Sequence, residues 1–340
     1  MRDDYLWDGS GEPDPEVRRL EALLSRFGYD RPTPEFPQLA ASRGGIGIRV
    51  VLVRFAVAAT LVAVIGVAWL VVRMGRPAWE VATLQGTPRV GSDTINDTGR
   101  LTVGQWLVTD GASRARISVG EIGQVHVEPN SRVRLLQAKV TEHRLALERG
   151  ALQATIWAPP RLFFVNTPSA VATDLGCAYT LHVDRTGSGL LHVMYGWVAF
   201  ELNGRESFVP QGALCATRPG IGPGTPYFED APKPFEVKLA ALDFGALGPQ
   251  DRAEALRLVL TEARVRDAFT LWHLLSRVEG DERVSVYDRL AELVPPPSDV
   301  TREGVLRSDK PMLGLWWDQL GLKDTSWWRM WKGPTPLQQK

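Results

Sequence analysis

An unbroken apolar run of 18 residues, positions 55–72, constrains this chain more than any other feature. Arg54 precedes the run and Arg73 follows it. In a helix, at about 1.5 Å per residue, such a run covers roughly 27 Å, close to the thickness of a hydrocarbon core. It starts late and is long for a secretory signal peptide, and it lacks the polar stripe of a buried helix. The sequence therefore predicts a single transmembrane helix over residues 48–73.

The charges around this run leave its orientation open, because three arginines stand near each end. The whole chain has 39 Lys and Arg against 39 Asp and Glu, so no net charge points to nucleic acid. Residues 1–42 differ, since nine Asp and Glu against five Arg give a net charge of −4. Such a segment either meets a basic partner or is an ordinary solvated surface.

The cysteine count is two, Cys177 and Cys215, both behind the apolar run. An even count behind a membrane span is typical of one disulfide in an oxidising compartment. The other interpretation is two buried free thiols that pack as small apolar side chains. The disulfide interpretation places the long C-terminal piece outside the cytoplasm.

The N-terminal piece, residues 1–47, contains the signals for one amphipathic helix. Asp14 suits the N-cap and Pro15 the first helical position. One stripe collects the apolar residues Val17, Leu20, Leu23, Leu24 and Phe27. A single short helix cannot bury a core, so it must dock on a partner, on a second copy or on the membrane surface. Val17, Leu20, Leu24 and Phe27 are therefore the candidate partner-binding residues.

The segment 76–245 alternates between apolar and polar residues and is broken by Gly, Asn, Asp and Pro, which predicts antiparallel strands. Its clearest hairpin signal is Asn203–Gly204 between two strand-like runs. From residue 249 to 340 the apolar period becomes three and four, which predicts packed helices. The expected fold class is an all-β main domain, a sandwich or stacked antiparallel strands, with one transmembrane helix and a small C-terminal all-α region.

Six of the twelve tryptophans lie in the C-terminal region. They are Trp272, Trp316, Trp317, Trp327, Trp328 and Trp331. These rings either pack the helical region together, form a surface for a partner, or lie at a membrane interface.

A series of short segments in the β region follows the order of a known family. Thr109 and Ala115 fit its opening segment, Pro129 and Ser131 fit an "L-x-P-x-S-x-[LV]" turn, and Gly150 fits "L-x-x-G-x-[LV]". The matching stretches are 103–115, 127–133, 147–152, 164–179, 193–198 and 210–212. On these motifs the β region resembles the FecR family of single-span bacterial proteins, whose extracytoplasmic β domain takes part in transmembrane signalling to sigma factors.

This resemblance implies a regulator or sensor anchored in the inner membrane, with its N-terminus in the cytoplasm and its C-terminal bulk outside. It implies a sigma factor, or another cytoplasmic regulator, as the partner of residues 1–47, and an envelope ligand or protein for the β domain. The chain departs from the family at Ala170, where glycine is usual, and at Cys177, where threonine is frequent. Residues 1–48 contain no His and no Cys, so the zinc-type anti-sigma segment of some members is absent.

Candidate catalytic chemistry is sparse in the sequence. His182 and His192 stand symmetrically about residues 184–189 and would face each other across a hairpin, but a metal site needs further ligands. The glycine-rich stretch 220–224 lacks the Lys-Ser/Thr ending of a phosphate loop. We therefore expect no enzyme, no cofactor and no metal.

Two functions remain open at this stage. The first is a FecR-like regulator that signals to a sigma factor, with membrane lipid around its span and no contact with nucleic acid. The alternative is a structural or scaffolding envelope protein whose β domain binds envelope components.

Overall fold

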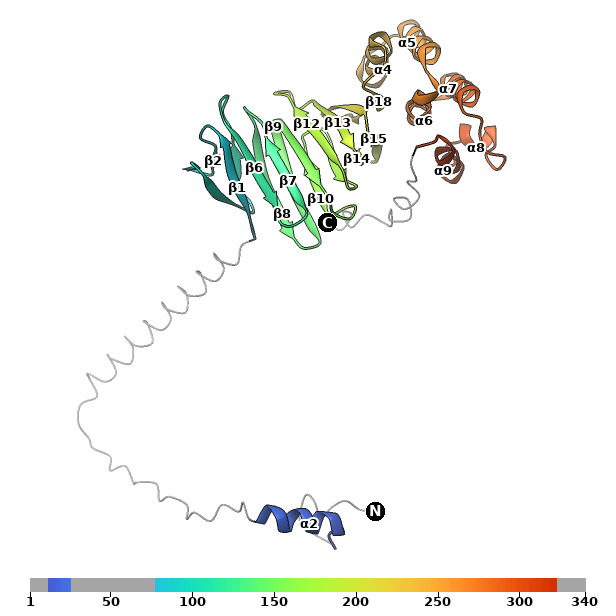
Figure 1. Ribbon diagram of the computed structural model, residues 1–340. Helices are drawn as coiled ribbons and strands as arrows, with labels where there is room; N and C mark the ends of the chain where they lie inside the picture. The colour runs from blue at the N-terminus through green and yellow to red at the C-terminus, as the bar shows by residue number, and fades with distance from the viewer. Residues whose placement is uncertain (1–11, 26–76, 323–340) are drawn as a thin grey trace, which may run out of the picture. The chain divides into compact units, whose positions relative to one another are not determined.

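The computed structural model describes residues 12–25 and 77–322. The chain divides into two compact units, Met1–Trp69 and Leu70–Lys340. The first contributes helix α2 (Pro15–Leu24). The second begins with paired β-strands and continues into a group of helices (Figure 1).

The strands of the second unit form two sheets, in which nearly all neighbours are antiparallel. Sheet A contains, in spatial order, β4 (Thr98–Thr102), β1 (Ala78–Gln85), β6 (Arg114–Val119), β7 (Gly123–Val127), β9 (Glu142–Ile156), β12 (Ala178–Val183), β13 (Gly189–Tyr195) and β16 (Ala213–Arg218), and β16 also pairs with β17 (Gly222–Pro223) and β18 (Tyr227–Phe228). Sheet B contains β3 (Asp93–Thr94), β2 (Arg89–Val90), β5 (Trp106–Val108), β8 (Arg132–Lys139), β9, β10 (Phe163–Asn166), β11 (Val171–Asp174), β14 (Trp197–Leu202) and β15 (Arg205–Pro210).

Strand β9 belongs to both sheets and joins them. Its first half pairs with β8 and β10, and its second half pairs with β7 and β12. The change of sheet occurs at Gly150, where φ is +93° and an added Cβ would lie 2.4 Å from the Ser131 Cα. Only glycine tolerates both the positive φ and the close approach of Ser131, which explains why Gly150 stands in the "L-x-x-G-x-[LV]" segment.

The core of the β domain lies between the two sheets. Alternate residues of both contribute fully buried side chains, for example Ile117 and Val125 from sheet A and Val133 and Leu145 from sheet B. This alternation is that of a two-layer sandwich and confirms the predicted β architecture.

The predicted hairpin is present as β14 and β15, and its turn residues Asn203 and Gly204 have φ values of +51° and +82°. The last strand ends at Phe228, so the predicted domain boundary at 245 falls after the first C-terminal helix instead of before it.

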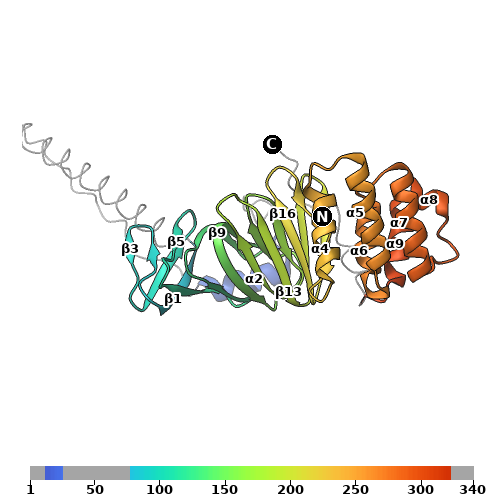
Figure 2. The same ribbon diagram turned by 90° about the horizontal axis from the view of Figure 1, so that it is seen from above.

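The C-terminal helices lie side by side beyond the strands (Figure 2). They are α4 (Lys233–Phe244), α5 (Pro249–Glu262), the 3₁₀ turn η2 (Val265–Asp267), α6 (Ala268–Leu275), α7 (Gly280–Leu293), α8 (Arg302–Leu306) and α9 (Lys310–Gln319). They enclose a second apolar core, whose largest fully buried side chain is Trp316. The predicted small all-α region is thus confirmed.

The structure contradicts the membrane part of the predicted fold class. Within residues 12–25 and 77–322, none of the helices combines the length and the apolar composition that crossing a membrane requires. The longest of them, α5 and α7, have 14 residues each; at 1.5 Å per residue this is about 21 Å, short of a hydrocarbon core of about 30 Å. The predicted span, 48–73, lies outside the described residues. The single-pass fold, the inner-membrane localisation and the contact with membrane lipid are therefore not retained.

Candidate functional site

Helix α2 forms where the sequence predicts it. The Oδ1 atom of Asp14 accepts a hydrogen bond from the backbone N–H of Glu16 at 2.9 Å, and Pro15 occupies the first helical turn. The missing N–H of proline costs no hydrogen bond there, because the first N–H groups of a helix have no partner within the helix. The local sequence thus fixes the start of the helix without help from packing.

The apolar stripe of α2 is left uncovered. Leu20, Leu23 and Leu24 are 56%, 57% and 62% exposed, Val17 is half-buried, and no residue of the helix is buried. The fourth predicted binding residue, Phe27, lies outside the described residues. The leucines therefore form a continuous apolar surface that is free to meet another molecule.

Helices α6 and α9 are packed against the β domain. Trp317 of α9 lies 6.1 Å from Trp197 and 6.0 Å from Phe208, measured between ring centroids, and 4.6 Å from Trp272 of α6. Core packing is thus the right interpretation for Trp272, Trp316 and Trp317. The remaining three C-terminal tryptophans lie outside the described residues.

His273 joins α6 to strand β15. Its Nε2 accepts a hydrogen bond from the backbone N–H of Phe208 at 3.0 Å, and its Nδ1–H donates to the carbonyl of Phe269 at 2.8 Å. Burial, with a smaller contribution from the positive charge of Arg277, lowers the pKa of His273 to about 3. The imidazole is neutral at physiological pH and both its nitrogens are occupied, so His273 is a structural link and not a proton shuttle.

Next to His273, a buried charge network joins the helices to the strands. Arg277 donates to Ser207 Oγ at 2.6 Å and to Thr225 Oγ1, and lies 3.5 Å from the Asp243 carboxylate. The same carboxylate accepts a hydrogen bond from Arg205 at 2.8 Å. Burial lowers the pKa of Arg277, while the negative charge of Asp243 opposes this. Sequence reasoning did not find this network, because its members are far apart in the chain and none stands in a motif.

The two cysteines are free thiols in the interior. Cys177 donates from Sγ to Asp174 Oδ2 at 2.7 Å, and Cys215 donates to the carbonyl of Gly224 at 3.3 Å. Cys177 directly precedes β12 and Cys215 lies on β16, and β13 lies between these two strands. Two strand spacings of about 4.8 Å already exceed the limit of roughly 7 Å for the Cα atoms of a disulfide. The candidate disulfide is thus not formed, and the free-thiol interpretation holds.

Cys177 and Asp174 form a buried acid–thiol pair. Burial raises the pKa of Asp174 to about 7, although hydrogen bonds from the Cys177 thiol and from the N–H of Gly176 oppose the shift. The pKa of Cys177 is raised as well, first by burial and then by the nearby carboxylate. A thiol whose ionisation is suppressed is a poor nucleophile, which argues against cysteine catalysis at this position.

The histidine pair expected across the β12–β13 hairpin is out of register. The turn closes with the Asp184 N–H on the Ser188 carbonyl, so that His182 lies opposite Leu190 and His192 lies opposite Thr180. His192 instead contacts the Glu229 carboxylate at 2.9 Å. In the part of the chain that the structure describes, no three His, Cys, Asp or Glu side chains are placed to hold a metal ion.

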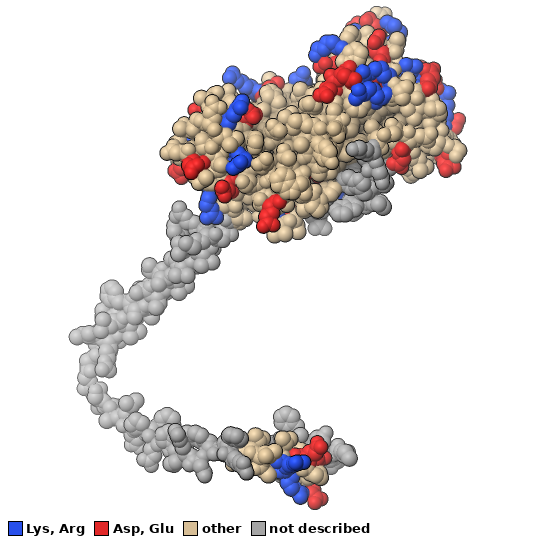
Figure 3. Space-filling view, in the orientation of Figure 1, with Lys and Arg blue, Asp and Glu red and all other residues tan. Residues whose placement is uncertain are grey.

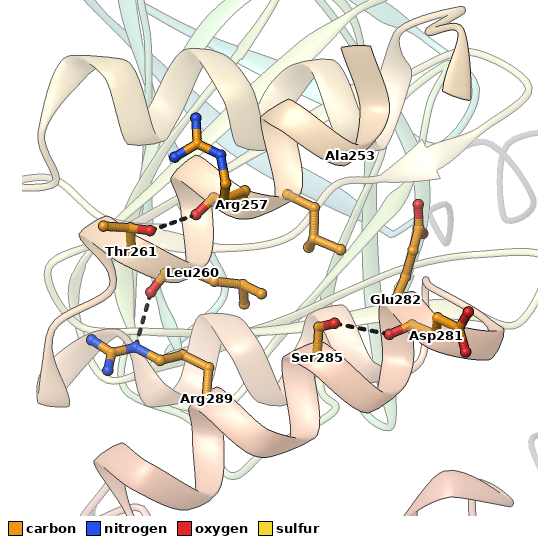
Figure 4. Close-up of a pocket in the computed structure, with 9 residues that line it drawn as sticks. Ala253, Arg257, Leu260, Thr261, Asp281, Glu282, Ser285 and Arg289 are labelled. Atoms are coloured by element: carbon orange, nitrogen blue, oxygen red, sulfur yellow. Dashed lines mark hydrogen bonds between the residues drawn. The ribbon is translucent and has the colours of Figure 1, made fainter. Parts of the chain in front are cut away.

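A shallow groove of about 580 Å³ lies between α5 and α7 (Figure 4). Its hydroxyl groups are already bonded within their own helices, since Thr261 donates to the Arg257 carbonyl and Ser285 to the Asp281 carbonyl. Arg289 donates to the carbonyl of Leu260 at the end of α5. These side chains stabilise helix termini and turns, and no hydroxyl is paired with a base as nucleophilic catalysis requires.

Comparisons with known proteins give little further support. No protein-family model matches the chain, and no curated protein matches it. Among the solved structures that resemble it are two crystal structures of a "putative anti-sigma factor" from Parabacteroides distasonis, each with 14% sequence identity and a TM-score of 0.33. The alignment covers 37% of this chain and 60% of the matched chain. A likeness this low carries no argument about function, and membership of the FecR family is not shown.

Proposed function

We propose that this chain is a non-catalytic regulator that controls a sigma factor, and that helix α2 is the element that binds it. The observation that carries the proposal is the uncovered leucine stripe of α2, with Leu20 and Leu24 56% and 62% exposed. An isolated helix of ten residues is marginal in water, so it gains stability mainly by burying such a stripe.

The charge of the segment around α2 supports the choice of partner. Residues 1–42 carry nine acidic and five basic side chains, a net charge of −4. Proteins that contact promoter DNA present basic surfaces to its phosphates. An acidic segment with a central apolar stripe would complement such a surface and compete with DNA for it. The order of FecR-like motifs in the β domain supports the same class of partner.

The proposal also states that the chain acts without catalysis. Both ring nitrogens of His273 are occupied, and the buried Cys177 thiol is protonated at neutral pH. The hydroxyl groups of the α5–α7 groove are used within their helices. These arrangements favour a protein that acts by binding.

Binding of the full chain to purified sigma factors of the same organism, measured by biolayer interferometry, tests the proposal. We expect one of them to bind, and the variant Leu20→Asp/Leu24→Asp to bind at least about tenfold more weakly, because burying a leucine contributes about 1.5–3 kcal/mol. Ala22→Asp is the control, since it adds a negative charge to the opposite side of α2, one charge against the two of the leucine variant. If no sigma factor binds, or if the leucine variant binds as well as the control, the proposal is wrong.

A further inference from the structure

The outer face of sheet A carries aligned rows of uncharged polar side chains. Strands β6, β7, β9, β12 and β13 lie side by side (Figure 1). Across them, His126, Gln153, Thr180 and His192 are cross-strand partners in a single row. Because partners in an antiparallel sheet point to the same side, these four side chains form a line with one member on each of β7, β9, β12 and β13, and Arg116 continues it on β6.

A second row runs parallel to the first. It contains Ser118, Gln124, Thr155 and Ala178, and ends at Tyr195. Successive members of either row are one strand spacing apart, about 4.8 Å. The face is thus a flat grid of hydrogen-bonding groups at a regular spacing.

Four of these polar side chains are unused within the described residues. Gln124, Gln153, Thr155 and Thr180 are half-buried, and their side chains make no hydrogen bond to another described residue, whereas His192 contacts Glu229. The outer face of sheet B differs, because there Arg132 pairs with Glu148 at 3.0 Å and Arg144 donates to Asn166 at 2.7 Å. These groups on sheet B satisfy one another, whereas the four glutamine and threonine side chains on sheet A are available to a ligand.

Two exposed aromatic side chains stand at one end of the grid. Tyr195 is 63% exposed and ends the second row, and Trp157 is 64% exposed and directly follows the last residue of β9, two residues beyond Thr155. The Trp157 indole is held in place by a hydrogen bond from its Nε1–H to the Glu121 carbonyl at 3.1 Å. Tyr195 and Thr155 are both cross-strand partners of Ala178, whose side chain is small. A ring that is fixed and exposed offers an apolar face at low entropic cost.

We propose that this face, the outer face of sheet A together with Trp157 and Tyr195, binds a neutral polysaccharide. The faces of sugar rings carry C–H groups that stack on indole and phenol rings, while their hydroxyl groups exchange hydrogen bonds with amides and hydroxyls. The strand spacing is close to the repeat of one sugar unit in an extended chain, so successive side chains of a row can form hydrogen bonds with successive sugars.

The charge of the face favours this ligand over the alternatives. The rows contain one basic residue, Arg116, as partner of His126, which is too few for a nucleic acid or a sulfated glycan. Figure 3 shows that the visible surface over the strands carries few charged residues, whereas charges of both signs gather over the helices. A protein partner would favour apolar anchors at the centre of the face, where glutamine and threonine stand instead.

Affinity gel electrophoresis of the full chain in gels containing laminarin, xylan, glucomannan or dextran tests this proposal. Heparin and a DNA duplex serve as charged probes. We expect retardation by at least one neutral polysaccharide, about tenfold weaker apparent affinity for Trp157→Ala and a severalfold loss for Thr180→Val. Thr173→Val, the same change on the outer face of sheet B, should bind like the wild type.

Three results would overturn the proposal. One is no retardation by any of the four polysaccharides at millimolar sugar. Another is retardation by heparin or DNA alone, which would make the face an anion-binding surface. The third is equal binding by Trp157→Ala, Thr180→Val and Thr173→Val, which would move the contact away from sheet A. Circular dichroism of each variant separates a loss of binding from a loss of fold.

Discussion

Helices α2 and α6 are both short and both contain several apolar residues, yet their environments are opposite. Seven of the eight residues of α6 are buried, and its Phe269 lies 4.7 Å from Phe228 of the β domain. None of the ten residues of α2 is buried. The apolar side chains of α6 pack against other residues of the same unit, whereas the leucine side chains of α2 remain exposed. An apolar stripe therefore predicts that a helix will dock, but it does not say on what.

The largest expected effect concerns the charge network that follows α6. Asp243→Ala would leave Arg277 and Arg205 without their shared carboxylate. Removing one partner of a buried ion pair costs about 3–5 kcal/mol, because the remaining charge is desolvated and unpaired. Urea unfolding followed by circular dichroism should show a loss of this size. A loss below about 1 kcal/mol would mean that the contact between α6 and the β domain, here called the α6 junction, is not tightly packed.

A matched pair of leucine truncations tests the comparison directly. Leu271→Ala in α6 removes a fully buried side chain, so we expect it to lower the free energy of unfolding by about 2–5 kcal/mol. Leu20→Ala in α2 removes an exposed one, so we expect a change within about 0.5 kcal/mol. Equal effects in the two helices would show that the leucine stripe of α2 is already covered in the free protein.

Acid should weaken the α6 junction through His273. Its pKa is about 3 in the folded protein and about 6.5 when unfolded. Between these values the unfolded chain binds a proton that the folded chain does not, so stability is full above pH 6.5 and falls toward pH 3, by at most about 1.4 kcal/mol per pH unit.

The raised pKa of Asp174 has the opposite effect, since its folded carboxyl keeps a proton up to about pH 7 and loses stability as the pH rises. The measurement is therefore made in the Asp174→Asn background, where the slope due to His273 is no longer opposed; His143, whose pKa is also lowered by burial, adds to it in the same direction. A flat profile between pH 4 and 6.5 in that background would contradict the burial of a neutral His273.

The smallest expected effect on stability comes from the variant that should weaken binding to the sigma factor. Leu20→Asp/Leu24→Asp changes only exposed side chains, so we expect the free energy of unfolding to stay within about 0.5 kcal/mol of the wild type. Chemical denaturation checks this. A larger loss would mean that the stripe has a structural role in the free chain.

Local signals in the sequence predicted the elements that local chemistry decides. Asp14 and Pro15 predicted the start of α2, and Asn203–Gly204 predicted the β14–β15 hairpin, because caps and tight turns depend on a few adjacent residues. Alternating polarity predicted the sandwich, since the pleat forces that period on any half-buried strand.

Features that depend on distant residues could not be predicted in the same way. Asp243 and Arg277 meet across 34 residues, and nothing in their local sequence distinguishes them from surface charges. The prediction that His182 and His192 face each other was wrong, because the strand register depends on where the hairpin turn closes. The sharing of β9 between two sheets is likewise a property of the whole fold, as is the position of β13 between β12 and β16, which separates the cysteines.

Hydrogen–deuterium exchange of the full chain, with and without the sigma factor that binds it, tests the central claim most directly. We expect the amides of α2 to exchange rapidly in the free chain, since no tertiary packing protects them, and to become protected on binding. The amides of α6 should be protected in both states. Protection that appears only in the β domain, with α2 unchanged, would contradict the account.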